Sequence, residues 1–295
     1  MNATDTAFFS SGCRIAARLR RPADSDGPSP AVVINHGYSG DMNEYDAMAE
    51  YLCAAGYATL QFDSRGCGNS SALKGRMMCA TEWIEDAQSA VSYVSSLDGV
   101  DSGRIGFTGC SMGGAVTVVM AALDERIRCA VSMSPMTGGR EMLERNWTKF
   151  RGPQAFARFM EELREDSIAV VLGQPSRVVS VPYALGMNME DAAEYLRVRA
   201  AAPDMVSHVP LESVRNSFLM FEPLLYAPRI RAPFLGVHGA ADEIVPIGQS
   251  ERLVSDISGI KEFVVIRDGP HPLPMSDKAP TVFALARDWF DRYLA

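Results

Sequence analysis

This sequence has few histidines, no closely spaced cysteine pairs and no long apolar run. Its 295 residues include four histidines and six cysteines, and the cysteines stand at 13, 53, 67, 79, 110 and 129. None of these positions has the CxxC or ligand spacing that is typical of a metal site, and no phosphate-binding loop is present. We therefore expect free thiols, most of them buried, and predict no metal and no other cofactor.

The chain also has little positive charge. It carries 28 Lys and Arg residues against 36 Asp and Glu residues, a formal net charge of -8. An acidic surface repels phosphate groups, so neither nucleic acid nor an anionic membrane is an expected partner. Residues 1–5 lack the basic and apolar parts of a signal peptide, and no apolar run could span a bilayer. We expect a cytoplasmic protein that binds a small-molecule substrate, as a monomer or a homodimer.

Apolar, β-rich runs alternate with helical patterns over most of the chain. Strands are predicted at 7–10, 13–20, 31–35, 57–62, 104–108 and 129–134, with helices at 43–54, 81–97 and 112–123. The alternation resumes with a strand at 232–238, a helix at 247–255, a strand at 261–266 and a helix at 280–294. This pattern predicts an α/β fold with a mostly parallel central sheet flanked by helices.

Between 137 and 229 the alternation stops, and only helical stretches are predicted, at 155–165, 191–202 and 211–225. This block is too long for an ordinary connection. We predict a core formed by 1–137 and 230–295, with 138–229 as a helical lid, or cap, inserted after the sixth strand. Its aromatic and methionine side chains suit an apolar ligand, although most of them are expected to pack on neighbouring helices. They are Phe150, Phe156, Phe159, Met160, Tyr183, Met187, Met189, Tyr195, Phe218, Met220, Phe221 and Tyr226.

The segment Gly109-Cys110-Ser111-Met112-Gly113 fits the pattern G-x-S-x-G and stands between a predicted strand and a very apolar helix. In this setting the pattern predicts a nucleophile elbow, a sharp turn that strains the serine backbone. The flanking glycines allow strand and helix to approach without a Cβ clash. Ser111 is the predicted nucleophile, and Cys110 is expected to point into the scaffold.

A serine hydroxyl is a poor nucleophile until a base takes its proton. Of the four histidines, His271 lies in the loop after the last predicted strand, at the same edge of the sheet as the elbow. It is therefore the predicted general base. His36 and His238 could polarise or pack near the site, and His208 lies in the predicted lid.

The base needs an anion that fixes its tautomer and stabilises the imidazolium. Asp242 follows the predicted strand 232–238 and is the expected acid, with Glu243 as its rival. The chain order Ser111, Asp242, His271 differs from the orders of the chymotrypsin and subtilisin designs and is found in hydrolases of the α/β type.

Negative charge that develops on a carbonyl oxygen needs two aimed backbone donors, an oxyanion hole. One is predicted to be the N–H of Met112, directly after the nucleophile. The other is predicted to be the N–H of Tyr38 in the turn after strand 31–35. The Tyr38 side chain is expected either to line the acyl pocket or to pack against neighbouring side chains.

Four segments together resemble the α/β-hydrolase superfamily: HGYSG at 36–40, FDSRGCGNS at 62–70, GCSMG at 109–113 and HGAADEIVP at 238–246. Within it they are most similar to dienelactone-hydrolase-like and cinnamoyl or feruloyl esterase-like serine hydrolases. The resemblance covers nearly the whole chain outside 138–229 and implies the fold, the triad and the oxyanion donors. Asp63 and Arg65 are expected to brace their loop rather than touch substrate. Pro270 departs from the family pattern, which has glycine before the histidine.

These residues predict a serine hydrolase that cleaves a carboxylic ester, lactone or thioester with an apolar acyl or aryl part, through an acyl-enzyme on Ser111. Three alternatives stay open. The first is a peptidase or amidase with the same triad, and the second a carbon–carbon bond hydrolase or biosynthetic cyclase. The third is a non-catalytic ligand receptor on the same fold. Sites of this kind vary with the lid, so the lid is expected to select the natural substrate.

Overall fold

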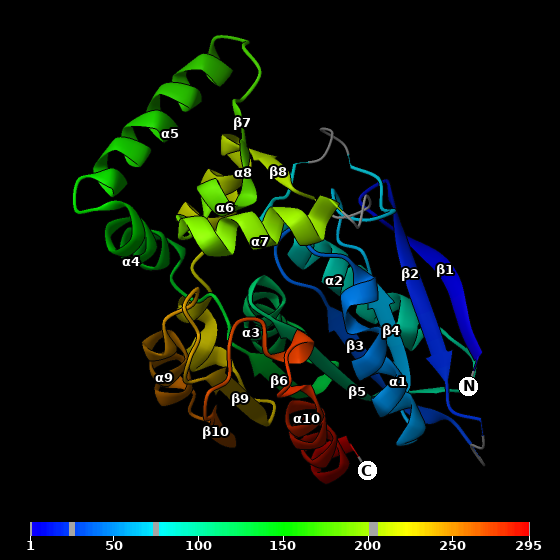
Figure 1. Ribbon diagram of the computed structural model, residues 1–295. Coiled ribbons are helices and arrows are strands. Elements are labelled where there is room, and N and C mark those ends of the chain that lie inside the picture. Colours follow the sequence, from blue (N-terminus) through cyan, green and yellow to red (C-terminus); the bar gives the residue numbers. More distant parts are fainter. Residues whose placement is uncertain (1, 24–26, 73–76, 201–205, 295) are drawn as a thin grey trace.

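The computed structural model describes residues 2–23, 27–72, 77–200 and 206–294 (Figure 1). Eight strands form one sheet in the order β1-β2-β4-β3-β5-β6-β9-β10. β2 pairs antiparallel with β1 and with β4, and the remaining neighbours are parallel. The prediction of a mostly parallel central sheet is therefore confirmed. The strands are β1 (Asn2–Ser10), β2 (Cys13–Arg21), β3 (Ser29–Asn35), β4 (Ala58–Phe62), β5 (Val100–Cys110), β6 (Ile127–Met133), β9 (Phe234–Gly239) and β10 (Lys261–Ile266).

Helices cover both faces of this sheet, which is why its central strands are continuous apolar runs without alternation. β3 illustrates this, since Val32, Val33 and Ile34 are all buried. α1 (Asp46–Ala54) and α10 (Ala279–Leu294) pack on one face. α2 (Ala80–Ser95) and α3 (Met112–Leu123) pack on the other, while α9 (Ile247–Asp256) contacts β9 and β10 (Figure 1).

Between β6 and β9 the chain leaves the sheet and forms mostly helical elements. These are α4 (Gly139–Arg151), α5 (Ala155–Val171), α6 (Val181–Ala184), α7 (Met189–Ala200), α8 (Leu211–Val214), the π-helical turn η2 (Arg215–Leu219) and the 3-10 helix η3 (Pro223–Arg229). α5 extends well beyond the end predicted at 165, and residues 201–202 of the predicted helix 191–202 lie outside the described residues.

Two predictions for this segment are wrong. Two short strands, β7 (Val178–Ser180) and β8 (His208–Pro210), pair antiparallel where no strand was expected. At three residues each, they are too short to show a period. The continuous helix predicted at 211–225 is instead three short elements, and regular turns stop before Pro223. Proline disfavours a helical conformation in the residue before it and cannot donate a backbone hydrogen bond.

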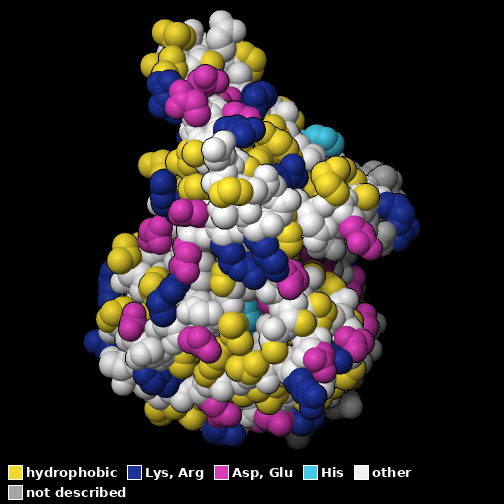
Figure 2. All heavy atoms as spheres, turned by 60° about the vertical axis from the view of Figure 1, so that its left-hand side comes forward, with side chains coloured by type: hydrophobic (Ala, Val, Ile, Leu, Met, Phe, Trp, Pro, Cys, Tyr) yellow, Lys and Arg dark blue, Asp and Glu magenta, His cyan; other side chains and the backbone are white. Residues whose placement is uncertain are grey.

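The inserted segment packs on the α2–α3 side of the sheet and continues the apolar core of that side. Trp147 of α4 stacks on Phe159 of α5 with ring centroids 4.3 Å apart, and Tyr183 meets the Trp147 ring edge-on at 5.0 Å. α5 reaches away from the body of the molecule (Figure 1). Lys and Arg side chains are interspersed with Asp and Glu over the face shown in Figure 2. None of the described helices combines the length and the apolar composition needed to cross a membrane.

Candidate active site

Ser111 stands at the turn between β5 and α3 with a strained backbone, φ 59° and ψ -118°. Its N–H donates to the carbonyl oxygen of Met133 on the neighbouring strand at 2.9 Å, which fixes the turn against the sheet. A Cβ on Gly113 would lie 2.2 Å from the carbonyl oxygen of Asn35, so only glycine fits there. The strained turn and the close approach of strand and helix agree with the predicted elbow.

The imidazole of His271 is held by Asp242. The distance from His271 Nδ1 to Asp242 Oδ2 is 2.7 Å, and the carboxylate is buried. Its other oxygen, Oδ1, accepts the backbone N–H groups of Ile244 at 2.9 Å and Val245 at 2.8 Å. Burial alone would raise the pKa of Asp242, but the charge of His271 and these hydrogen bonds hold that pKa below its ordinary value. An ionised carboxylate only accepts, so Nδ1 carries a proton, and in the neutral form of the ring Nε2 then holds the lone pair that a base requires.

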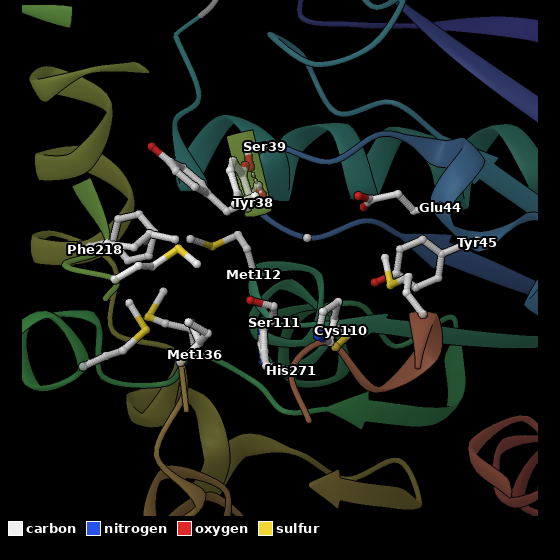
Figure 3. Close-up of a pocket in the computed structure, with 18 residues that line it drawn as sticks. Tyr38, Ser39, Glu44, Tyr45, Cys110, Ser111, Met112, Met136, Phe218 and His271 are labelled. Carbon is white, nitrogen blue, oxygen red and sulfur yellow. Dashed lines mark hydrogen bonds between the residues drawn. The ribbon is translucent and has the colours of Figure 1, made fainter. Parts of the chain in front are cut away.

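Ser111 and His271 line the same cavity (Figure 3). Among the described residues their side chains form no hydrogen bond with each other. Catalytic hydrogen bonds in unliganded enzymes are often long and tighten when substrate binds. Proton transfer between the two groups thus needs a closer approach than the one seen here.

The turn after β3 lies directly against the elbow. A Cβ on Gly37 would be 3.6 Å from the Cβ of Ser111. His36 holds this turn, because its Nε2 accepts the N–H of Ser64 at 2.9 Å and its Nδ1 donates to the carbonyl of Gly37 at 2.7 Å. This buried ring also meets Trp83 edge-on, with centroids 5.0 Å apart. His36 therefore packs, and does not act as a base.

The two predicted oxyanion donors come from these neighbouring turns. Met112 is the first residue of α3, and the first N–H groups of a helix have no acceptor within it. Tyr38 follows Gly37 and lines the cavity together with Met112. The Tyr38 ring packs edge-on against Phe218 at 4.8 Å, and its hydroxyl lies 2.7 Å from Ser213 Oγ.

The remaining candidates lie elsewhere. His238 is buried, and its Nε2 donates to the carbonyl of Val245 at 3.1 Å while Nδ1 accepts from the Ser250 hydroxyl at 2.7 Å. Both of its nitrogens are thereby engaged, so His238 packs. Glu243, the rival acid, is exposed, and so is His208 on β8. The structure therefore brings Asp242, and not Glu243, to His271.

The glycine-rich loop after β4 makes internal contacts, as expected. Asp63 accepts the N–H groups of Met42 at 2.7 Å and Asn69 at 2.8 Å. Arg65, which is buried, binds the buried carboxylate of Asp86 with its shortest contact at 2.6 Å. Both side chains brace the loop on which the turn at Gly37 rests.

None of the six cysteines forms a disulfide, and five of them are buried. Burial raises the pKa of the Cys110 thiol above its ordinary value, which makes this neighbour of Ser111 a poor nucleophile. Among the residues that the structure describes, no group of three His, Cys, Asp or Glu side chains is placed to hold a metal ion.

The cavity encloses about 830 Å³ of space, part of it open to solvent. One wall is apolar and is drawn largely from the inserted segment. Of the aromatic and methionine side chains predicted to suit a ligand, Met187, Tyr195 and Phe218 line it, whereas Met189 and Met220 are exposed. Further apolar residues that line the cavity are Met136, Met142, Leu185 and Ile244.

Glu44 and Tyr45 line the opposite end of the cavity (Figure 3), and sequence reasoning missed both. They lie in the 3-10 helix η1 (Met42–Tyr45), a region predicted to be part of a regular helix. Their closeness in sequence to Tyr38, whose N–H was predicted to hold the oxyanion, is the signal that could have identified them.

Comparison with known proteins gives a family match and relatives. The model of the family Hydrolase_4, described as serine aminopeptidase, S33, matches residues 26–278. The quorum-quenching protein AidA of Acinetobacter baumannii is 29% identical over 250 residues, which are 82% of this chain and 79% of AidA. A thiohydrolase of Eupenicillium brefeldianum is 30% identical over 171 residues, 57% of this chain and 51% of that protein.

A solved structure extends the likeness to the whole chain. The α/β-hydrolase GrgF from Penicillium sp. sh18 superposes with a TM-score of 0.80 over 100% of this chain and 99% of GrgF, at 17% identity. The likeness is one of fold, and it confirms the α/β-hydrolase fold predicted from the sequence.

Proposed function

This chain belongs to the Hydrolase_4 family, described as serine aminopeptidase, S33, and on this premise we propose that it is a serine hydrolase of carboxylic esters, lactones or thioesters. Ser111, His271 and Asp242 are its proposed nucleophile, base and acid. The observation that carries this proposal is the 2.7 Å contact between His271 and Asp242, in a cavity that His271 shares with a strained serine at a nucleophile elbow.

The chemistry follows from the positions of these groups. His271 Nε2 takes the proton of the Ser111 hydroxyl as its oxygen attacks the substrate carbonyl, and Asp242 stabilises the resulting imidazolium. The N–H groups of Met112 and Tyr38 hold the oxyanion. Collapse of the tetrahedral intermediate expels the leaving group, which takes the proton from His271 and leaves an acyl-enzyme on Ser111. Water, deprotonated by His271, then releases the acid.

The apolar wall of the cavity supports an apolar acyl or aryl part. Met136, Met187 and Phe218 there are large side chains without charge, and methionines adapt to irregular ligand shapes. The thiohydrolase among the relatives supports thioesters as members of the substrate class.

We further propose that 138–229 acts as a lid over a core formed by 1–137 and 230–295. Met142, Leu185, Met187, Tyr195 and Phe218 of this segment line the cavity that holds Ser111. A lid that supplies the acyl wall would set the substrate range without touching the triad.

The second candidate is a peptidase, which the description of the family favours. An aminopeptidase must bind a substrate ammonium close to the scissile carbonyl, on the acyl side. Among the described residues that line the cavity, Glu44 is the one with a carboxylate, and it lies at the end opposite the apolar wall (Figure 3). The ester and thioester assignment therefore fits the acyl side better.

The test compares purified wild-type protein with Ser111→Ala on p-nitrophenyl butyrate and on an aminoacyl p-nitroanilide. We expect ester turnover that the variant lacks, and little anilide turnover. A fluorophosphonate probe should label the wild type and not Ser111→Ala. The matched control is Ser92→Ala, an exposed serine on α2 that should keep both turnover and labelling. Turnover retained by Ser111→Ala would refute the nucleophile, and preferred anilide cleavage would favour the peptidase.

A further inference from the structure

The hydroxyl of Tyr45 is a buried polar group without a hydrogen bond of normal geometry. Tyr45 is 1% exposed, and no described residue bonds its hydroxyl within normal limits, although the backbone N–H of Cys110 is near enough to oppose the rise in its pKa. A buried polar atom left unsatisfied costs about 1–3 kcal/mol, so native structures rarely keep one without a reason. Tyr45 lines the catalytic cavity, and its oxygen is directed inward, toward the side of Cys110 (Figure 3). Such a group is placed to bind a ligand.

The surroundings of this hydroxyl differ from the rest of the cavity. Glu44, the preceding residue of η1, brings a carboxylate to the same end, while the apolar wall lies beyond Ser111 on the other side (Figure 3). Pro272 and Met275 complete this end, and Met275 belongs to the 3-10 helix η4 (Leu273–Met275), which packs against η1. The polar end therefore lies between η1 and the stretch of chain that directly follows His271.

The position of His271 decides which half of a substrate this end receives. The imidazolium must protonate the leaving atom, so the leaving group has to lie beside His271. The acyl part then extends toward the apolar wall, and the leaving group toward Tyr45 and Glu44. Burial raises the pKa of Tyr45 well above its ordinary value, so the phenol stays protonated and can donate as well as accept.

We propose that Tyr45 and Glu44 form a leaving-group subsite that recognises an alcohol or thiol bearing a second hydroxyl or amino group. The inference rests on the proposed function, because it requires a substrate that is cleaved at Ser111. Tyr45 donates to or accepts from the second polar group, and the Glu44 carboxylate accepts from its hydrogen. The same carboxylate repels leaving groups that carry a carboxylate or phosphate.

The test uses pairs of butyrate esters that differ by one isosteric group. The pairs are 2-hydroxyethyl with propyl, 3-hydroxypropyl with butyl, and 4-hydroxybutyl with pentyl, and the release of acid is followed with a pH indicator. For the best-fitting length we expect the wild type to show a kcat/KM about fivefold or more higher on the hydroxyl ester. In Tyr45→Phe the ratio of the two kcat/KM values should fall to about one.

Tyr57→Phe is the matched control, because Tyr57 is also buried but donates to Asp291 at 2.7 Å, away from the cavity. It should keep the wild-type ratio. Tyr45→Phe should change the melting temperature little, since the lost hydroxyl forms no hydrogen bond of normal geometry with the protein. A lowered melting temperature with an unchanged ratio would overturn the subsite and assign Tyr45 a structural role. Equal turnover of both esters by the wild type would also overturn the subsite while leaving the proposed function intact. No turnover of any ester would instead refute the proposed function, and the subsite with it.

Discussion

Nδ1 of His271 lies 2.7 Å from Oδ2 of Asp242, although the two residues are 29 positions apart in the chain. They meet because β9 and β10 are adjacent parallel strands whose last residues, Gly239 and Ile266, are in register. The loops that follow these two strands are in contact from their first residues. The N–H of Ala240 donates to the carbonyl of Ile266 at 2.9 Å, and a Cβ on Gly239 would lie 2.1 Å from the carbonyl oxygen of Gly269. The proposed acid and base are thus positioned by backbone contacts.

The first prediction concerns this pair. Asp242→Asn should lower kcat for ester hydrolysis by about 10³- to 10⁴-fold, because a neutral amide can hold the wrong tautomer of His271 and cannot stabilise the imidazolium. Steady-state kinetics at pH 7.5 measure the loss. Glu243→Gln is the matched control and should retain nearly all activity. If Asp242→Asn kept its kcat and Glu243→Gln lost it, Glu243 would be the acid in place of Asp242.

The second prediction concerns His238, whose pKa burial lowers, against the partly compensating charge of Asp242 3.5 Å away. The unfolded chain then binds more protons than the folded one below the ordinary histidine pKa of about 6.5. The free energy of unfolding should therefore fall as the pH drops below about 6.5, and this contribution should level off below the folded-state pKa. His238→Asn removes the titrating group. The free energy of unfolding of this variant should therefore change less between pH 7.5 and 5 than that of the wild type.

Urea unfolding of the wild type and of His238→Asn at several pH values measures this difference. His208→Asn is the control, because His208 is exposed on β8 and should leave the pH dependence as it is in the wild type. An equally steep pH dependence in wild type and His238→Asn would contradict the assignment of His238 as a neutral packed ring.

Parts of this molecule follow from local sequence, and α3 is the clearest case. The helix predicted at 112–123 has the bounds of α3, because an apolar run is limited by the elbow before it and by Asp124 after it. The helix predicted at 211–225 is wrong because its pattern crosses Pro223 and because contacts with the core shape the π turn before it. β7 and β8 exist only as a pair, so neither can be seen in its own three residues.

Part of the candidate site also follows from local sequence, and part does not. Ser111, Asp242 and His271 stand in motifs at strand ends, and parallel strands bring their ends to one edge whatever the loops do. Tyr45 could not be found in this manner. Whether its hydroxyl faces the cavity depends on how η1 turns against η4, a contact between segments that lie far apart in the chain. Which side chains of residues 138–229 reach the cavity likewise depends on tertiary packing.

The third prediction concerns Gly113. Gly113→Ala should destabilise the protein by about 3 kcal/mol or more, because the new methyl would lie 2.2 Å from the carbonyl oxygen of Asn35 and 2.6 Å from that of His36. The displaced backbone also carries both proposed oxyanion turns, so residual folded protein should be inactive. Urea unfolding and ester turnover measure the two effects.

Gly248→Ala in α9 is the matched control. A Cβ there has its nearest neighbour at 3.9 Å, in the flexible Glu251 side chain, so the change should stabilise by about 0.5–1 kcal/mol. Similar effects of the two substitutions would mean that the elbow does not require glycine at 113.

The fourth prediction concerns the anchoring of the inserted segment. Asp166 of α5 is buried and binds Arg215 of η2 at 2.6 Å, the N–H of Arg177 at 2.6 Å and the Ser176 hydroxyl at 2.9 Å. Burial would raise the pKa of Asp166, but these partners hold it below its ordinary value, so the carboxylate stabilises the fold at neutral pH. This contribution should be lost only as the pH falls from about 4 through the folded-state pKa.

Asp166→Asn should therefore cost about 3 kcal/mol at pH 7.5, the lower end of the range for breaking a buried pair, since Arg215 keeps some contact with solvent. Because η2 also carries Phe218 of the apolar cavity wall, KM should rise more for a long-chain p-nitrophenyl ester than for the acetate, with kcat for the acetate changed least. Glu161→Gln, which breaks the exposed pair with Arg164 on the same helix, should change neither quantity. If Asp166→Asn instead lowered kcat equally for esters of all chain lengths, α5 would influence the proposed triad directly. That result would argue against a proposed lid that acts only through the apolar cavity wall.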